Sequence, residues 1–95
     1  MELNKVIRKY KIELATKQTI DVDQNPKLID IIVENDSIYM LMEVIPNKDV
    51  GVLTVEIYKE EEIIPMEMYA NKVYIGSFSI NNERNYVYTS NPIRK

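Results

Sequence analysis

The sequence contains no cysteine, no histidine and no tryptophan, and its only glycines are Gly51 and Gly76. Without cysteine there is no disulfide, no thiolate nucleophile and no cysteine-bearing zinc site, and we expect a reducing compartment. Without histidine the usual proton shuttle at neutral pH and the commonest transition-metal ligand are missing. Two glycines cannot build a glycine-rich phosphate loop. These absences exclude the usual cysteine and histidine enzymes and the nucleotide-binding enzymes that rely on such a loop.

Long apolar runs are also missing from the 95 residues. No stretch approaches the ~18 consecutive apolar residues of a transmembrane helix, and residues 1–14 lack the apolar segment of a signal peptide. We therefore expect a cytoplasmic protein with no membrane contact. The net charge of −3 argues against a surface built for duplex nucleic acid. A chain of this length forms one domain of limited stability, which favours a homo-oligomer.

The hydrophobic pattern predicts strands throughout. Alternation of apolar and polar residues predicts half-buried strands near residues 6–14 and 18–22. The almost continuous apolar run at 28–34 predicts a strand that is covered on both faces and lies centrally in a sheet. A short polar connection at 35–37 then predicts a hairpin with residues 38–45. Residues 52–58 predict a fifth strand, with Leu53, Val55 and Ile57 on the core face.

The second half of the chain follows the same pattern. Pro65 prevents a helix in residues 59–71, which we interpret as a loop. Residues 72–80 predict a strand with Tyr74, Phe78 and Ile80 on one face, and with either a bulge or a close neighbouring backbone at Gly76. A last short strand at 86–89 is a candidate for an unpaired edge, and residues 90–95 are expected to form a frayed tail. The sequence thus predicts a single all-β domain over 1–95, a small antiparallel sandwich or open barrel of about six or seven short strands.

Carboxylates supply two candidate sites. The run Glu60-Glu61-Glu62, with Glu56 and Glu67 nearby, would hold a hard cation, meet a basic partner, or simply form a solvated loop. The solvated loop is favoured because adjacent side chains diverge and the spacing of a calcium loop is absent. Asp21 and Asp23 share one face of a predicted strand, so they form either a carboxylate pair or ordinary turn chemistry, and the break at 24–26 favours the turn.

Aromatic and basic residues supply two more candidates. The chain has seven tyrosines but one phenylalanine, and tyrosine suits interfaces as well as cores. Arg84, Tyr86 and Tyr88 alternate on one predicted face, where they would stack a base and neutralise a phosphate or merely half-bury the sheet. The methionines at 40, 42, 66 and 68 would form an adaptable contact surface, although the first two fit a core better. The basic stripe Lys5, Arg8, Lys9 and Lys11 would contact phosphates or form the wet face of an edge strand.

Four segments together carry a family resemblance: Lys9-Tyr10-Lys11-Ile12, residues 18–22, residues 27–31 and Tyr74-Ile75-Gly76-Ser77-Phe78. Over residues 5–89 they resemble a family of small β-rich proteins of tailed phages, of unknown function. Relatives carry a Gly-Thr-Gly-His-Pro loop after the fifth strand, where this chain has residues 59–65, so no ligand role is carried over from that loop. The resemblance implies a phage or prophage origin. It also implies an action on host machinery or defence systems.

These observations lead to two functional hypotheses, neither with a catalytic residue, a cofactor or a metal. The first is a non-enzymatic binding protein in the host cytosol that neutralises a host or defence protein by stoichiometric contact. Its partner-binding residues would be Tyr58, Glu60, Glu61 and Glu62. The alternative is an oligomeric trap that sequesters a nucleotide-derived signal molecule. Its ligand-binding residues would be Arg84, Tyr86 and Tyr88.

Overall fold

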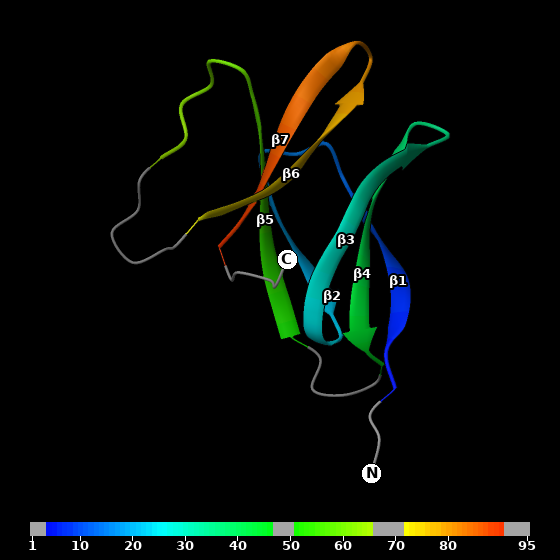
Figure 1. The fold of residues 1–95 in the computed structure, drawn as a ribbon. Helices are drawn as coiled ribbons and strands as arrows, with labels where there is room; N and C mark the ends of the chain where they lie inside the picture. Colours follow the sequence, from blue (N-terminus) through cyan, green and yellow to red (C-terminus); the bar gives the residue numbers. More distant parts are fainter. Residues whose placement is uncertain (1–3, 47–50, 66–71, 91–95) are drawn as a thin grey trace.

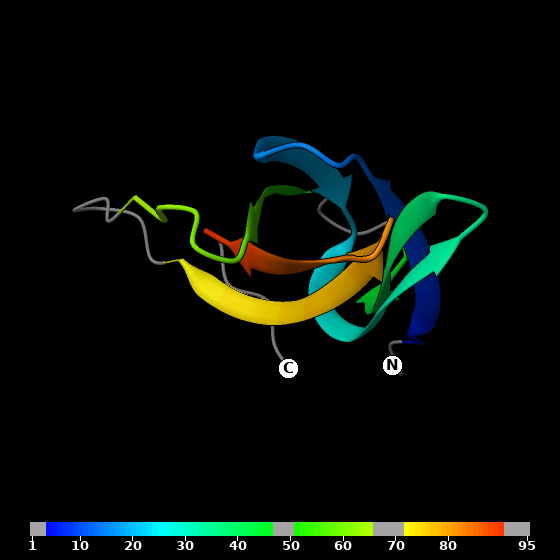
Figure 2. The ribbon, with the colours of Figure 1, turned by 90° about the horizontal axis from the view of Figure 1, so that it is seen from above.

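Seven antiparallel strands make up the fold in a computed structural model, which describes residues 4–46, 51–65 and 72–90. No helix occurs in these residues, which confirms the predicted all-β class. A three-stranded sheet has the order β1-β4-β3, and a four-stranded sheet has the order β2-β5-β7-β6. The two sheets form an open sandwich (Figure 1 and Figure 2). The strands are β1 (Val6–Ile12), β2 (Lys17–Val22), β3 (Gln24–Glu34), β4 (Ser37–Ile45), β5 (Gly51–Lys59), β6 (Val73–Ile80) and β7 (Glu83–Thr89).

Each sheet contains one hairpin, and neither hairpin turn uses glycine. Asn35 and Asp36 link β3 to β4 with φ of 50° and 63°, and Asn81 and Asn82 link β6 to β7 with φ of 52° and 63°. Two-residue hairpin turns with positive φ at both central positions match the twist of the flanking strands. Asparagine and aspartate tolerate this left-handed conformation better than other side chains. The predicted hairpin of β3 and β4 is confirmed.

The core lies between the two sheets and takes alternate residues from each strand. On β5 the buried residues Leu53, Val55 and Ile57 face inward, as predicted from the alternation. Met40 and Met42 on β4 are 0% exposed, which confirms that they are core residues. The other apolar residues of this cluster are Ile12, Val22, Ile38, Val44, Ile75, Phe78 and Val87. The sandwich is therefore held by one continuous apolar layer.

Two expected strand positions are wrong. β3 was expected at the centre of a sheet, but it forms an edge of the three-stranded sheet, and its exposed Ile29 lies at a register shift. It also begins earlier than expected, at Gln24, and runs through Pro26, which an edge strand tolerates. β7 was expected as an edge, but it pairs with β5 on one side and β6 on the other. The expected cover on both faces of β3 is wrong as well, because none of its residues is fully buried and Ile29 and Asp30 are exposed.

The bulge predicted at Gly76 is present and changes which side chains share a face. The pairing of β6 with β7 shifts register between Tyr74 and Gly76. As a result Ile75 and Phe78 face the core, while Tyr74 faces outward and is 42% exposed, so the expectation that Tyr74 and Phe78 share a face is wrong. A Cβ on Gly76 would lie 3.0 Å from Cδ1 of Ile31 on β3. The missing side chain therefore lets β3 pack closely against β6.

Candidate functional site

Four tyrosines gather on the outer side of the four-stranded sheet. Tyr58 comes from β5, Tyr86 and Tyr88 from β7, and Tyr74 from β6, three strands that are hydrogen-bonded neighbours. The ring centroids of Tyr74 lie 5.6 Å from Tyr88 and 6.4 Å from Tyr86, and those of Tyr58 and Tyr88 are 5.9 Å apart. The contacts of Tyr88 with Tyr58 and Tyr74 are edge-to-face, which is favourable for aromatic pairs, whereas Tyr74 and Tyr86 are tilted at 44°. We call the surface formed by Tyr74, Tyr86 and Tyr88 the tyrosine face.

The alternation of β7 produces this surface. Asn85, Val87 and Thr89 are buried on the core side, so residues 84, 86 and 88 point outward. The prediction that Arg84, Tyr86 and Tyr88 share one face is thus confirmed. Tyr86 and Tyr88 are half-buried by their neighbours and Arg84 is exposed. The tyrosine face and Arg84 beside it therefore present aromatic rings, hydroxyl groups and a guanidinium group to solvent.

Tyr58 does not belong to the exposed surface. Its ring is only 3% exposed, although it lies on the outer side of the sheet. Its hydroxyl donates to Glu56 Oε1 at 2.5 Å, and Lys72 Nζ lies 5.9 Å from its ring centroid. The expectation that Tyr58 contacts a partner directly is therefore wrong, since other groups of this chain cover the ring. The ring of Tyr58 instead makes an edge-to-face contact with Tyr88.

A buried ion pair lies beside Tyr58, and sequence reasoning did not find it. Lys72 Nζ lies 3.2 Å from Glu56 Oε1, with side-chain exposures of 8% and 4%. Ser90 donates to Glu56 Oε2 at 3.2 Å, and Lys72 Nζ also donates to the carbonyl of Pro65 at 2.7 Å. Glu56 is on β5, Lys72 precedes β6 and Ser90 follows β7. The carboxylate of Glu56 therefore links β5 to the residues that flank β6 and β7.

The contacts of Glu56 also set its protonation. Burial alone raises the pKa of a carboxyl group because it disfavours the charged form. Here the hydrogen bonds from Tyr58 and Lys72 outweigh burial and hold the pKa of Glu56 below its ordinary value. Burial, followed by the hydrogen bond to Glu56, raises the pKa of Tyr58. Glu56 is therefore a charged group that the fold neutralises internally, with no role left for an outside cation.

The acidic run lies at one end of the tyrosine face. Glu60, Glu61 and Glu62 are all exposed, and Glu61 has a φ of 68° in the turn after β5. Glu60 Oε1 accepts a hydrogen bond from the Tyr86 hydroxyl at 3.0 Å, which raises the pKa of Tyr86. Glu62 Oε1 instead accepts from the backbone N–H of Lys59 at 2.7 Å. The three carboxylates thus diverge, as their adjacency predicts, and only Glu60 joins the tyrosine face.

Arg84 completes the rim of this surface. Its Nη1 donates to Ser77 Oγ on β6 at 3.1 Å. Beside it is a hollow of about 490 Å³, lined by Lys59, Glu60, Glu62, Asn82, Glu83 and Arg84. The lining carries both signs of charge, and Lys59 Nζ lies 3.3 Å from Glu83 Oε2. In the described part of the chain no three carboxylates come together as a metal site. The predicted neighbour Glu67, with Met66 and Met68, lies outside the described residues.

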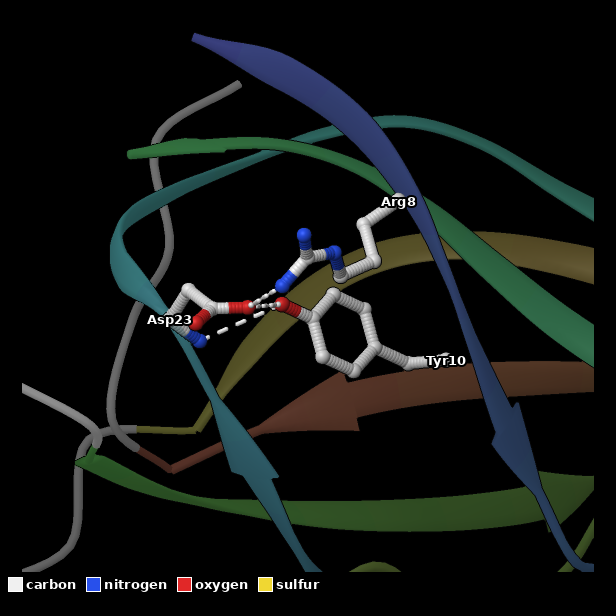
Figure 3. A network of polar contacts seen from close by, with 3 residues as sticks. All are labelled: Arg8, Tyr10 and Asp23. Carbon is white, nitrogen blue, oxygen red and sulfur yellow. Dashed lines mark hydrogen bonds and ion pairs between the residues drawn. The ribbon is translucent and has the colours of Figure 1, made fainter. Parts of the chain in front are cut away.

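Asp21 and Asp23 do not form a carboxylate pair. Asp21 is exposed, whereas Asp23 is buried where the chain leaves β2 for β3 (Figure 3). Arg8 Nη1 lies 2.9 Å from Asp23 Oδ2, and the Tyr10 hydroxyl donates to the same oxygen at 2.5 Å. The backbone N–H of Asp23 in turn donates to the Tyr10 hydroxyl at 3.2 Å. These contacts tie β1 of one sheet to the crossing between the sheets, which is a structural role.

The basic stripe is largely neutralised by this chain's own carboxylates. Lys5 Nζ lies 3.4 Å from Glu43 and Lys9 Nζ 2.5 Å from Glu34. The hydrogen bond to Glu34 raises the pKa of Lys9, and the same ammonium group lies 4.8 Å from the centroid of the Tyr39 ring. Arg8 is held by Asp23. The stripe is therefore the wet face of an edge strand, paired with carboxylates of the same chain.

Fold and surface together define a small all-β sandwich domain with one aromatic face. The chain belongs to the family described as Domain of unknown function (DUF7352), whose model matches residues 3–93. No curated protein and no solved structure matches the sequence significantly. Among the described residues there is no helix of the length and apolar character needed to cross a bilayer. Ser90 is held by the bonds given above, and the rest of the expected C-terminal tail, residues 91–95, lies outside the described residues.

Proposed function

We propose that this chain is a non-enzymatic binding protein that contacts another protein through the tyrosine face. The observation that carries the proposal is the cluster of Tyr74, Tyr86 and Tyr88 on an outer sheet surface, in which the ring of Tyr74 contacts the other two. Tyrosine and arginine are enriched in the energetic centres of protein interfaces. The buried pair of Glu56 and Lys72 fixes Tyr58, whose ring contacts Tyr88, and order that exists before binding reduces its entropy cost.

The acidic residues at the end of the tyrosine face indicate the charge of the partner. Glu60 is bonded to Tyr86, Glu61 is exposed next to it, and Glu62 is exposed but bonds the backbone N–H of Lys59. Exposed charges at the rim of an interface mainly speed association. A basic partner surface therefore fits best. The resemblance to small tailed-phage proteins extends the proposal to a phage- or prophage-encoded protein that neutralises a host or defence component in the host cytosol.

The test of the tyrosine face compares variants of the same residue type. Wild-type protein, Tyr74→Ala/Tyr86→Ala and Tyr39→Ala are used as baits against host extracts, with a binding titration on any purified partner. Tyr39 lies half-buried in the three-stranded sheet, whereas the tyrosine face belongs to the four-stranded sheet. Tyr39 therefore serves as the matched control. We expect a stoichiometric partner with wild type and Tyr39→Ala and loss of roughly tenfold or more in affinity with the double variant. Equal binding by all three would refute the proposal.

The acidic residues are tested by kinetics. Replacing Glu60, Glu61 and Glu62 by glutamine should lower the association rate and its dependence on salt, while the dissociation rate changes little. An unchanged association rate would remove these residues from the proposal and leave the tyrosine face.

The nucleotide trap remains as an alternative, supported by the position of Arg84 two residues before Tyr86. It is less well supported, because the carboxylate of Glu60 at the Tyr86 hydroxyl would repel a phosphate. Heating the protein with cyclic and ADP-ribose-type nucleotides decides the matter, since a tight ligand raises the melting temperature. A shift with any of them that Arg84→Ala abolishes would favour the trap over the protein partner.

A further inference from the structure

The four sheet edges of this sandwich differ in how well they are protected. An edge strand presents unpaired N–H and C=O groups that another chain can pair with, and proteins block such edges by lysines, bulges or cover. β1 carries Arg8, Lys9 and Lys11, and such long charged side chains block an edge even where, as for Arg8 and Lys9, they are paired with carboxylates of the same chain. β3 has two register shifts, and β6 has a bulge at Gly76 where β3 packs against it. β2, by contrast, pairs with β5 in continuous register over its whole length.

The backbone of β2 shows which groups face the open side. The N–H of Ile57 donates to the carbonyl of Thr16 at 3.0 Å, so Thr16 and Ile57 form a hydrogen-bonded pair. In an antiparallel ladder such pairs recur at every second residue, here at Gln18 and Ile20. The N–H and C=O groups of Lys17, Thr19 and Asp21 therefore point away from β5. No other strand of the described chain pairs with them.

The side chains of the same three residues are complementary to themselves. Lys17, Thr19 and Asp21 are exposed. In an antiparallel pair of two β2 strands centred on Thr19, Lys17 of each copy lies directly opposite Asp21 of the other. Centring on Lys17 or Asp21 would place like charges opposite each other. Neither residue belongs to any ion pair within the described residues, so both charges remain available to a second copy.

We infer that the chain forms a twofold-symmetric dimer through β2, with Thr19 opposite Thr19 of the partner copy and Lys17 opposite Asp21 of that copy. The two four-stranded sheets then become one continuous antiparallel sheet. Each directly opposed pair of outward residues exchanges two backbone hydrogen bonds, and opposite charges facing each other across strands add to this. The tyrosine faces of both copies stay open, because β2 and the strand β6 that bears Tyr74 are opposite edges of the sheet.

The experiment reverses the charges of Lys17 and Asp21 one at a time and then mixes the two variants. Sedimentation across micromolar to millimolar concentrations should give a wild-type mass of twice the 11.2 kDa chain. Lys17→Asp places Asp opposite Asp, and Asp21→Lys places Lys opposite Lys, so each variant alone should dimerise on the order of tenfold more weakly. Mixed together, the two variants carry complementary strands and should form a heterodimer. Lys11→Asp on β1 is the control and should dimerise like wild type.

Cysteine crosslinking then tests the symmetry axis. Directly opposed residues of a hydrogen-bonded pair have Cα atoms about 5.5 Å apart, which suits a disulfide. Because the chain has no native cysteine, Thr19→Cys should crosslink rapidly under mild oxidation, and Lys11→Cys should not. Circular dichroism confirms that each variant is folded. A wild type that stays monomeric at every concentration would overturn the inference, and so would single charge variants that dimerise as well as wild type and show no gain on mixing.

Discussion

Breaking the buried pair of Glu56 and Lys72 gives the sharpest test of what holds the tyrosine face. Lys72→Met keeps the length of the side chain but removes its charge, leaving the carboxylate of Glu56 buried with donors only from Tyr58 and Ser90. Removing one partner of a buried pair costs about 3–5 kcal/mol. Because two donors remain, we expect a loss of about 3 kcal/mol in the free energy of unfolding. For a domain of this size that lowers the melting temperature by roughly 12–24 °C.

The assay is chemical and thermal unfolding of a double-mutant cycle. Glu56→Met/Lys72→Met removes both charges, and replacing a whole buried pair by apolar side chains is often close to neutral. We therefore expect the double variant to be more stable than Lys72→Met alone. The matched control is Lys59→Met, which breaks the exposed contact of Lys59 with Glu83 and should cost at most about 0.5 kcal/mol. A loss below about 1 kcal/mol for Lys72→Met, or a double variant less stable than either single one, would refute the reasoning.

The pH dependence of the same residue has a definite sign. The pKa of Glu56 is lower in the folded chain than its ordinary value of 4.5. Its contribution to stability is therefore complete above about pH 4.5 and is lost as the pH falls through the lower, folded value. In Lys72→Met the buried carboxylate has lost its cation, so acid should destabilise this variant less than wild type. Unfolding curves recorded between neutral pH and about pH 2 measure this difference.

Two further predictions concern contacts elsewhere in the fold. Tyr10→Phe removes the hydroxyl that bonds Asp23 and should cost about 2 kcal/mol, against almost nothing for Tyr39→Phe. Because burial and then Asp23 raise the pKa of Tyr10 above 10.0, wild-type stability should also fall above pH 10.0 more than that of Tyr10→Phe. Gly76→Ala should lower the free energy of unfolding by about 1 kcal/mol, because the added methyl meets Ile31. Combining it with Ile31→Val, which deletes the contacting methyl, should recover part of that loss, as measured by urea unfolding.

The local parts of the fold were predictable because they depend on neighbouring residues. Alternation identified the inward face of β5, and the polar pair Asn35 and Asp36 identified the hairpin. Position within a sheet depends on partners far along the chain, so the edge position of β3 and the interior position of β7 were missed. The bulge at Gly76 was expected, but its effect on which side chains share a face was not, since one inserted residue puts Tyr74 before it and Phe78 after it on opposite faces.

The candidate site shows the same limit. The shared face of Arg84, Tyr86 and Tyr88 follows from the alternation within one strand. The link of Glu56 to Lys72 joins residues on either side of the loop after β5, and no local pattern reports such a contact. Tyr58 appeared exposed for the same reason: its position in the strand pointed it outward, and Lys72, which lies over its ring, comes from beyond the loop that follows β5.

The two methionines at the centre of β4 offer a built-in reporter of breathing motions. Because Met40 and Met42 are 0% exposed, peroxide reaches their sulfur atoms only when the sandwich opens. The rate at which peroxide converts each to a sulfoxide, followed peptide by peptide in a mass spectrometer, therefore measures how often the two layers separate, without any label on the protein.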